Sequence, residues 1–182
     1  GVYETRDQTG NWRHIANLPV SQFYHVSVDN EWPYNVYGGL QDNGSWRGPS
    51  RAPGGIRNKH WDSIGFGDGF WAFADPNDVN TIYSEYQGGQ LRRVNDQLGE
   101  VKEIAPAAGE GEEDLRFNWN TPLHLSPNHK GRLYYGSQYV HVSDDQGESW
   151  RTISPDLTTD DPNRQRQKQS GGLSIDNSCL LY

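Results

Sequence analysis

The sequence of 182 residues contains one cysteine, Cys179, and no methionine. A single cysteine cannot form an internal disulfide, so cysteine usage leaves the redox compartment open. No stretch approaches the roughly 18 apolar residues of a transmembrane helix, and no signal peptide is visible. We therefore expect no membrane span. Since methionine is absent even at position 1, and the chain starts within an expected strand, we interpret it as a piece of a longer protein.

Positive charge is scarce as well. The 16 Lys and Arg residues are outnumbered by 24 Asp and Glu residues, which gives a formal net charge of −8. Nucleic-acid backbones are bound largely through Lys and Arg, so we expect no nucleic-acid partner. Walker and dinucleotide-binding motifs are missing, and the six histidines lack ligand-like spacing, so we expect no cofactor and no metal site. The histidines are His14, His25, His60, His124, His129 and His141.

Aromatic residues and turn formers are abundant, with 7 Trp, 10 Tyr, 21 Gly and 10 Pro. Many short strands joined by tight turns fit this composition. Three stretches share a register in which Asp or Ser precedes Tyr by eight residues: 29–37, 75–83 and 126–134. A glutamine follows each tyrosine by four residues, at Gln41, Gln87 and Gln138. The tyrosines recur after 46 and 51 residues, a period typical of β-propeller blades.

The stretch 143–150 reads Ser-Asp-Asp-Gln-Gly-Glu-Ser-Trp and fits the Asp-box pattern Ser-x-Asp-x-Gly-x-x-Trp. Carboxylates in such a turn bond local backbone N–H groups, and glycine readily takes positive φ. Trp150 opens the outgoing strand, where its ring can pack under the turn. We therefore assign a structural role rather than a catalytic one to Ser143, Asp145, Gly147 and Trp150.

These patterns predict an all-β fold: a partial β-propeller of four-stranded antiparallel blades with Asp-box hairpins. About fourteen strands are expected, including Phe23–Val28, Asn35–Leu40 and one over 59–64, and another begins after Gly171. Segment 105–114 is expected to be an exposed loop. The whole chain, 1–182, is then a fragment of one propeller, with expected boundaries at 1–18 (end of a blade), 19–64, 65–108 and 109–158 (one blade each) and 159–182 (loop and start of the next blade).

Several longer strings carry a family resemblance: Tyr-Gly-Gly-Leu-Gln-Asp-Asn-Gly (37–44), Gly-Asp-Gly-Phe (67–70), Arg-Phe-Asn-Trp-Asn-Thr-Pro (116–122), the Asp box, and Ile-Ser-Pro-Asp-Leu-Thr (153–158). They resemble BNR-repeat propellers, in particular the sortilin-like and xyloglucanase-like bacterial secreted proteins often labelled glycosyl hydrolases. The resemblance implies a secreted or periplasmic location, and a propeller completed by further blades or by other chains. It also implies a glycan, protein or peptide ligand.

The candidate site lies in loops that a four-stranded meander brings to the face opposite the Asp-box turn. Asp42 and Asp68 are the candidate catalytic acids, although each also suits a tight turn. A retaining glycosidase needs carboxyl groups about 5 Å apart, and an inverting one about 6.5–9.5 Å. Arg116 could clamp a carboxylate or hydroxyl, and Trp119 could stack on a sugar, or either could fill the wall. The candidate ligand-binding residues are Gln41, Asn43, Glu85, Arg116, Asn118, Trp119 and Asn120.

Three functions remain open from the sequence. The first is an extracytoplasmic binding module for a protein, peptide or glycan. The second is a glycoside hydrolase of the xyloglucanase-like type, with Asp42 or Asp68 as acid or base. The third is a purely structural piece whose edges pair with other chains.

Overall fold

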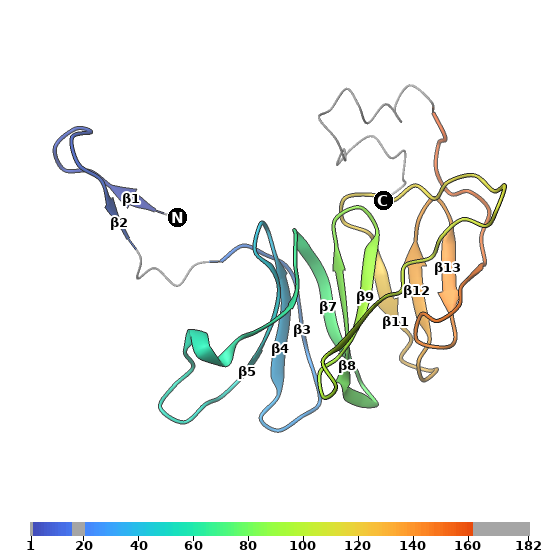
Figure 1. The fold of residues 1–182 in the computed structure, drawn as a ribbon, viewed down its shortest axis with the longest axis horizontal. Helices are drawn as coiled ribbons and strands as arrows, with labels where there is room; N and C mark the ends of the chain where they lie inside the picture. The colour runs from blue at the N-terminus through green and yellow to red at the C-terminus, as the bar shows by residue number, and fades with distance from the viewer. Residues whose placement is uncertain (1, 16–20, 162–182) are drawn as a thin grey trace.

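The computed structural model describes residues 2–15 and 21–161, and within them the chain is all-β (Figure 1). Four antiparallel sheets contain its strands, and the only helical segment described is a short 3₁₀ turn, η1 (Asn58–His60). None of the described sheets closes on itself. The described residues include no helix long and apolar enough to cross a membrane. The two-stranded sheet consists of β1 (Tyr3–Glu4) and β2 (Arg13–His14).

Each of the other three sheets has four strands in sequential order, so each is a meander without crossovers. The first contains β3 (Phe23–Val28), β4 (Asn35–Leu40), β5 (Gly44–Pro49) and β6 (Asp62–Gly65). The second contains β7 (Gly69–Asp75), β8 (Asp78–Tyr86), β9 (Gln90–Asn95) and β10 (Glu100–Glu103). The third contains β11 (Leu123–Leu125), β12 (Leu133–Gly136), β13 (Val140–Ser143) and β14 (Arg151–Thr152).

The strand predictions agree closely with this arrangement. Fourteen strands are described, and the expected bounds of β3 and β4 are confirmed. The expected strand over 59–64 is wrong in its first half, because His60 Nδ1 and His60 N–H both bond the backbone of Arg57 and close the 3₁₀ turn η1. The strand proposed after Gly171 lies outside the described residues.

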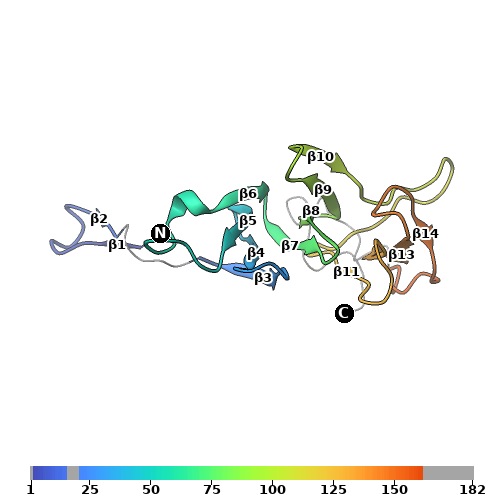
Figure 2. The same ribbon diagram turned by 90° about the horizontal axis from the view of Figure 1, so that it is seen from below.

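The β7–β10 sheet packs between the other two four-stranded sheets, in the order that Figures 1 and 2 show. Side chains alternate across a strand, so neighbouring residues of β8 serve opposite faces. Ile82 packs with Tyr37 and Ile64 of the β3–β6 sheet, and Tyr83 packs with Leu133 and Tyr135 of the β11–β14 sheet. Two aromatic and aliphatic cores therefore hold three sheets in a row.

An arginine clamp repeats at both sheet junctions. Arg47 pairs with Tyr37 across β4 and β5, and Arg93 pairs with Tyr83 across β8 and β9. Arg47 donates to Asp96 in the turn of the next sheet at 2.7 Å. Arg93 likewise donates to the Gln146 carbonyl at 2.9 Å and to the Glu148 carboxylate at 2.6 Å in the next turn along. Equivalent positions therefore use the same side chain to fix successive sheets.

The β13–β14 turn behaves as its sequence predicts. Asp145 Oδ1 accepts the Ser149 N–H at 2.9 Å, and Ser143 Oγ accepts the Gly147 N–H at 2.8 Å. The hydrogen bonds from Ser149 and Ser143 lower the pKa of Asp145 to about 2. Trp150 is partly buried in the second core and donates its indole N–H to the Ile104 carbonyl at 2.7 Å. The turn thus ties its own hairpin to the preceding sheet.

Candidate functional site

The predicted site loops do reach one edge of the sheets, where backbone hydrogen bonds link each loop to the next. The Asp42 N–H in the β4–β5 turn donates to Asp68, which precedes β7. The Asp68 N–H donates to Gln87 in the β8–β9 turn, and the neighbouring Gly88 N–H donates to the Trp119 carbonyl at 3.2 Å. The junctions around Asp42, Asp68 and Trp119 are therefore contiguous.

The repeated glutamines explain how this edge is built. Gln87 Oε1 accepts the Asp68 N–H at 2.7 Å, and Gln138 Oε1 accepts the Arg116 N–H at 2.8 Å. In both cases the glutamine follows the second strand of a sheet and holds the segment that enters the same sheet. Gln138 is fully buried and also donates to the Asp114 carbonyl at 3.1 Å. At Gln87 and Gln138, the repeated glutamine therefore marks a side chain that fixes a loop.

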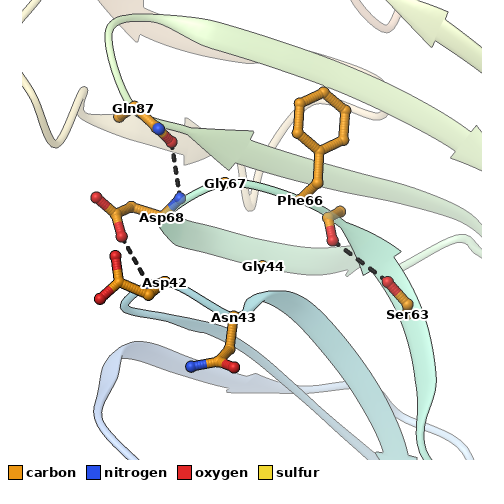
Figure 3. Close-up of a pocket in the computed structure, with 9 residues that line it drawn as sticks. Asp42, Asn43, Gly44, Ser63, Phe66, Gly67, Asp68 and Gln87 are labelled. Atoms are coloured by element: carbon orange, nitrogen blue, oxygen red, sulfur yellow. Dashed lines mark hydrogen bonds between the residues drawn. The ribbon is translucent and has the colours of Figure 1, made fainter.

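Asp42 and Asp68 line one hollow of about 450 Å³, with Asn43, Phe66 and Gln87 around it (Figure 3). Asp68 is buried, with 8% exposure, and its Oδ1 accepts the Asp42 N–H at 2.7 Å. Asp42 is exposed and takes a left-handed conformation with φ of 60°, which brings its backbone toward the Asp68 carboxylate. The two candidate catalytic carboxylates therefore line the same hollow.

Tyr24, near the start of β3, lies close enough to Asp42 and Asp68 to interact with their charges. Burial first, and then the charges of Asp68 and Asp42, raise the pKa of its hydroxyl. Its ring packs on Phe70 of β7 with 4.3 Å between ring centroids. The Tyr24 hydroxyl interacts electrostatically with both carboxylates and is a potential hydrogen-bond donor beside them. Sequence reasoning missed this residue, because no local pattern links it to either aspartate.

A second hollow of about 770 Å³ adjoins the first and shares Asp42 and Asn43 with it. Its aromatic wall includes Trp46, whose indole N–H donates to the Asn43 carbonyl at 2.6 Å. Trp61 lies flat against Gly48, where an added Cβ would meet the ring at 2.5 Å. The residues that line this hollow are Ser21, Gln22, Phe23, Leu40, Gln41, Asp42, Asn43, Trp46, Asn58 and Trp61.

Glu85 lies at the second sheet junction and is fully buried. Its carboxyl group accepts the N–H of Thr121 at 3.2 Å and that of Trp71 at 3.5 Å. Burial raises the pKa of Glu85 well above its ordinary value, in spite of these hydrogen bonds. Glu85 therefore joins the β7–β10 sheet to the segment that enters β11.

Arg116 is already engaged by the chain's own carboxylates. Its guanidinium donates to Asp156 at 2.6 Å, contacts Asp160 at 3.2 Å, and keeps only 13% of its side chain exposed. These contacts fix the segment after β14 to the segment before β11. A ligand carboxylate would have to compete with Asp156 for this group.

The amides near Trp119 also have partners within the fold. Asn118 is buried and its Oδ1 accepts the Trp119 N–H at 2.9 Å. Asn120 Nδ2 lies 3.1 Å from His25 Nε2, and the His25 ring stacks on Trp71 with centroids 3.7 Å apart. None of the residues from Asn118 to Asn120 lines the two hollows at Asp42. The predicted site is therefore divided into a hollowed part and an internally bonded part.

The hollowed part offers carboxylate, amide and aromatic groups within one continuous surface. Such a set can accept and donate hydrogen bonds to hydroxyl or peptide groups and can stack against an apolar face. Within residues 2–15 and 21–161, no cluster of three or more His, Cys, Asp or Glu side chains is placed to hold a metal ion. No protein-family model matches the chain, and no curated protein matches it.

Proposed function

We propose that the chain is part of a BNR-repeat, Asp-box β-propeller related to the sortilin-like proteins. Three meanders in sequence, the repeated arginine clamp and the bonding of Asp145 within its turn support this proposal. On the same grounds of resemblance, the protein works outside the cytoplasm, secreted or periplasmic. Its remaining blades, or other chains, complete the ring.

The proposed activity is ligand binding at the edge that carries Asp42 and Asp68. One observation carries it: the exposed Asp42–Asn43 turn separates two adjoining hollows, one with both carboxylates and the other with aromatic walls. Pockets for small ligands combine an apolar lining with a few well-placed polar groups. A glycan or a peptide meets both requirements, since each alternates polar groups with apolar faces.

A binding screen of the chain against a glycan panel and a peptide library tests this function. We expect saturable binding that Asp42→Asn and Asn43→Ala weaken roughly tenfold, because each removes an exposed side chain of the shared turn. Trp12→Ala serves as the control, because Trp12 is exposed just before β2 and lines neither hollow. If all three variants bind as the parent chain does, the site is elsewhere.

A glycoside hydrolase is the second candidate, and the shared hollow of Asp42 and Asp68 favours it specifically. Glycosidases use two carboxyl groups on adjoining segments, one as acid and the other as base or nucleophile. Under this proposal Asp42→Asn and Asp68→Asn each abolish glucan hydrolysis while the chain stays folded. Binding without hydrolysis across the whole glycan panel would exclude the enzyme and leave the binding module.

A further inference from the structure

A separate cavity of about 620 Å³ lies between the β11–β14 sheet and the long segment that joins β10 to β11. It is distant in sequence from both hollows at Asp42 and shares no residue with them. One wall comes from β13, from β14 and from the residue that precedes each of these strands, and the other wall comes from the joining segment. The residues that line the cavity are Pro106, Ala107, Glu112, Glu113, Leu115, Tyr139, His141, Trp150 and Thr152.

The cavity wall that the sheet forms contains aromatic side chains whose positions are fixed by contacts within the fold. Trp150 donates its indole N–H to the Ile104 carbonyl, which fixes the plane of the ring. Its ring also packs near Tyr135, with centroids 6.1 Å apart. Tyr139 meets the His141 ring edge-on at 88°, with centroids 6.2 Å apart. Two electron-rich rings, Tyr139 and Trp150, are thus present before any ligand arrives.

His141 contributes no positive charge to this wall at neutral pH. Its Nε2 lies 2.7 Å from Ser137 Oγ, and its Nδ1 lies 3.3 Å from Thr152 Oγ1, so both ring nitrogens have hydroxyl partners. Burial lowers the pKa of His141 below its ordinary value of 6.5. A ligand with a positive charge therefore meets a neutral imidazole.

The opposite side of the cavity is acidic. Glu112 and Glu113 are exposed and line it, and Glu112 Oε2 accepts the Gly109 N–H at 2.9 Å, which anchors its carboxylate over the loop. Arg116 forms an ion pair with Glu113 at 3.6 Å, but the same guanidinium also pairs with Asp156 at 2.6 Å and with Asp160 at 3.2 Å. One positive charge is therefore shared among three carboxylates. The acidic side keeps an excess of negative charge, to which the neighbouring Glu110 and Asp114 add.

From this combination we propose that the cavity binds an organic cation on an apolar stem, namely an arginine or lysine side chain of a peptide. The ring faces of Tyr139 and Trp150 attract a cation through their quadrupoles, and the carboxylates of Glu112 and Glu113 attract it by charge. The stem packs against Leu115, Pro106 and Ala107. The two carboxylates would repel an anion, and a neutral apolar group would have no electrostatic attraction to them.

The proposal is tested on the complete 182-residue chain with two probes of nearly equal shape. Nα-acetyl-arginine N-methylamide carries the cation, and the citrulline analogue replaces its guanidinium by a neutral urea. We expect the arginine probe to bind with a Kd of about 1 mM in low salt, at least fivefold more tightly than the citrulline probe. Raising the salt to about 0.5 M should remove most of that difference, because exposed charges are screened.

Paired variants locate the site. The double variant Glu112→Gln and Glu113→Gln keeps the shape and the acceptor for Gly109, and it should remove the preference for arginine over citrulline. Glu110→Gln removes one charge from the same loop but does not line the cavity, and it should keep the preference. Equal binding of the two probes, absence of saturable binding, or an equal loss in Glu110→Gln would each overturn the proposal. An unchanged preference in the double variant would overturn it too.

Discussion

The Asp68 carboxylate accepts the backbone N–H of Asp42 at 2.7 Å, so the two candidate catalytic residues are joined through a backbone group of one and the side chain of the other. Asp42 holds a left-handed conformation there. Asp68 therefore shapes the turn that presents Asp42 and Asn43, in addition to any role toward a ligand.

The first prediction separates these two roles of Asp68. Asp68→Ala leaves the Asp42 N–H without its acceptor in a partly buried hydrogen bond, which should cost about 1–3 kcal/mol in the free energy of unfolding. Asp68→Asn keeps an Oδ1 acceptor and should cost less than about 1 kcal/mol. Urea unfolding of both variants measures the difference. Equal losses would show that the turn does not depend on this hydrogen bond.

The second prediction concerns the repeated glutamines. Gln138→Ala removes both side-chain bonds, to Arg116 and to Asp114, at a fully buried position. We expect a loss of about 1–3 kcal/mol in the free energy of unfolding, because buried backbone groups lose their partners. Gln97→Ala, at an exposed turn position, is the control and should change stability by less than about 0.5 kcal/mol. Similar losses in both would mean that Gln138 does not fix the loop.

The third prediction addresses Trp150. Its ring packs in the core between the second and third meanders and bonds Ile104, so Trp150→Ala should cost roughly 3–5 kcal/mol. Thermal denaturation followed by circular dichroism gives the loss. A shift of the melting temperature by only a degree or two would show that the ring is dispensable.

The fourth prediction is a pH dependence that arises from Glu85. Burial raises the folded-state pKa of Glu85 well above 4.5, so the folded state keeps a proton that the unfolded state releases. Its contribution to stability is fully present below about pH 4.5 and is lost as the pH rises through the folded pKa. Glu85→Gln should therefore gain stability relative to the parent chain as the pH rises above about 4.5, by up to about 1.4 kcal/mol per pH unit. Parallel unfolding curves at several pH values test this, and a constant difference would contradict it.

Much of the fold followed from local patterns in the sequence. The register that places Tyr37 and Tyr83 eight residues after an aspartate predicted β4 and β8, because turn and strand chemistry are local. Segment 57–61 escaped prediction, since its 3₁₀ turn depends on one imidazole bond to the Arg57 N–H. Local patterns therefore predicted the strands more accurately than the connections between them.

The sequence predicted where the candidate site loops lie but not which hydrogen bonds and ion pairs their residues form. Chain topology brought Asp42, Asp68 and Trp119 to one edge, as a meander requires. The partners of Arg116 and Glu85 come from residues 40 and 36 positions away, and no local pattern shows such contacts. The cavity at Trp150 was missed for the same reason, because segment 105–114 looked like a plain exposed loop.

The measurement that tests the central claim most directly is a site-resolved one. Backbone amide resonances of the isotope-labelled chain would be followed by NMR while the tightest ligand from the glycan and peptide screen is added. Our account predicts shifts concentrated at Gln41, Asp42, Asn43, Asp68 and Gln87, which together line the two hollows, and loss of those shifts in Asp42→Asn. Shifts confined to other parts of the chain, with those five amides unmoved, would contradict it.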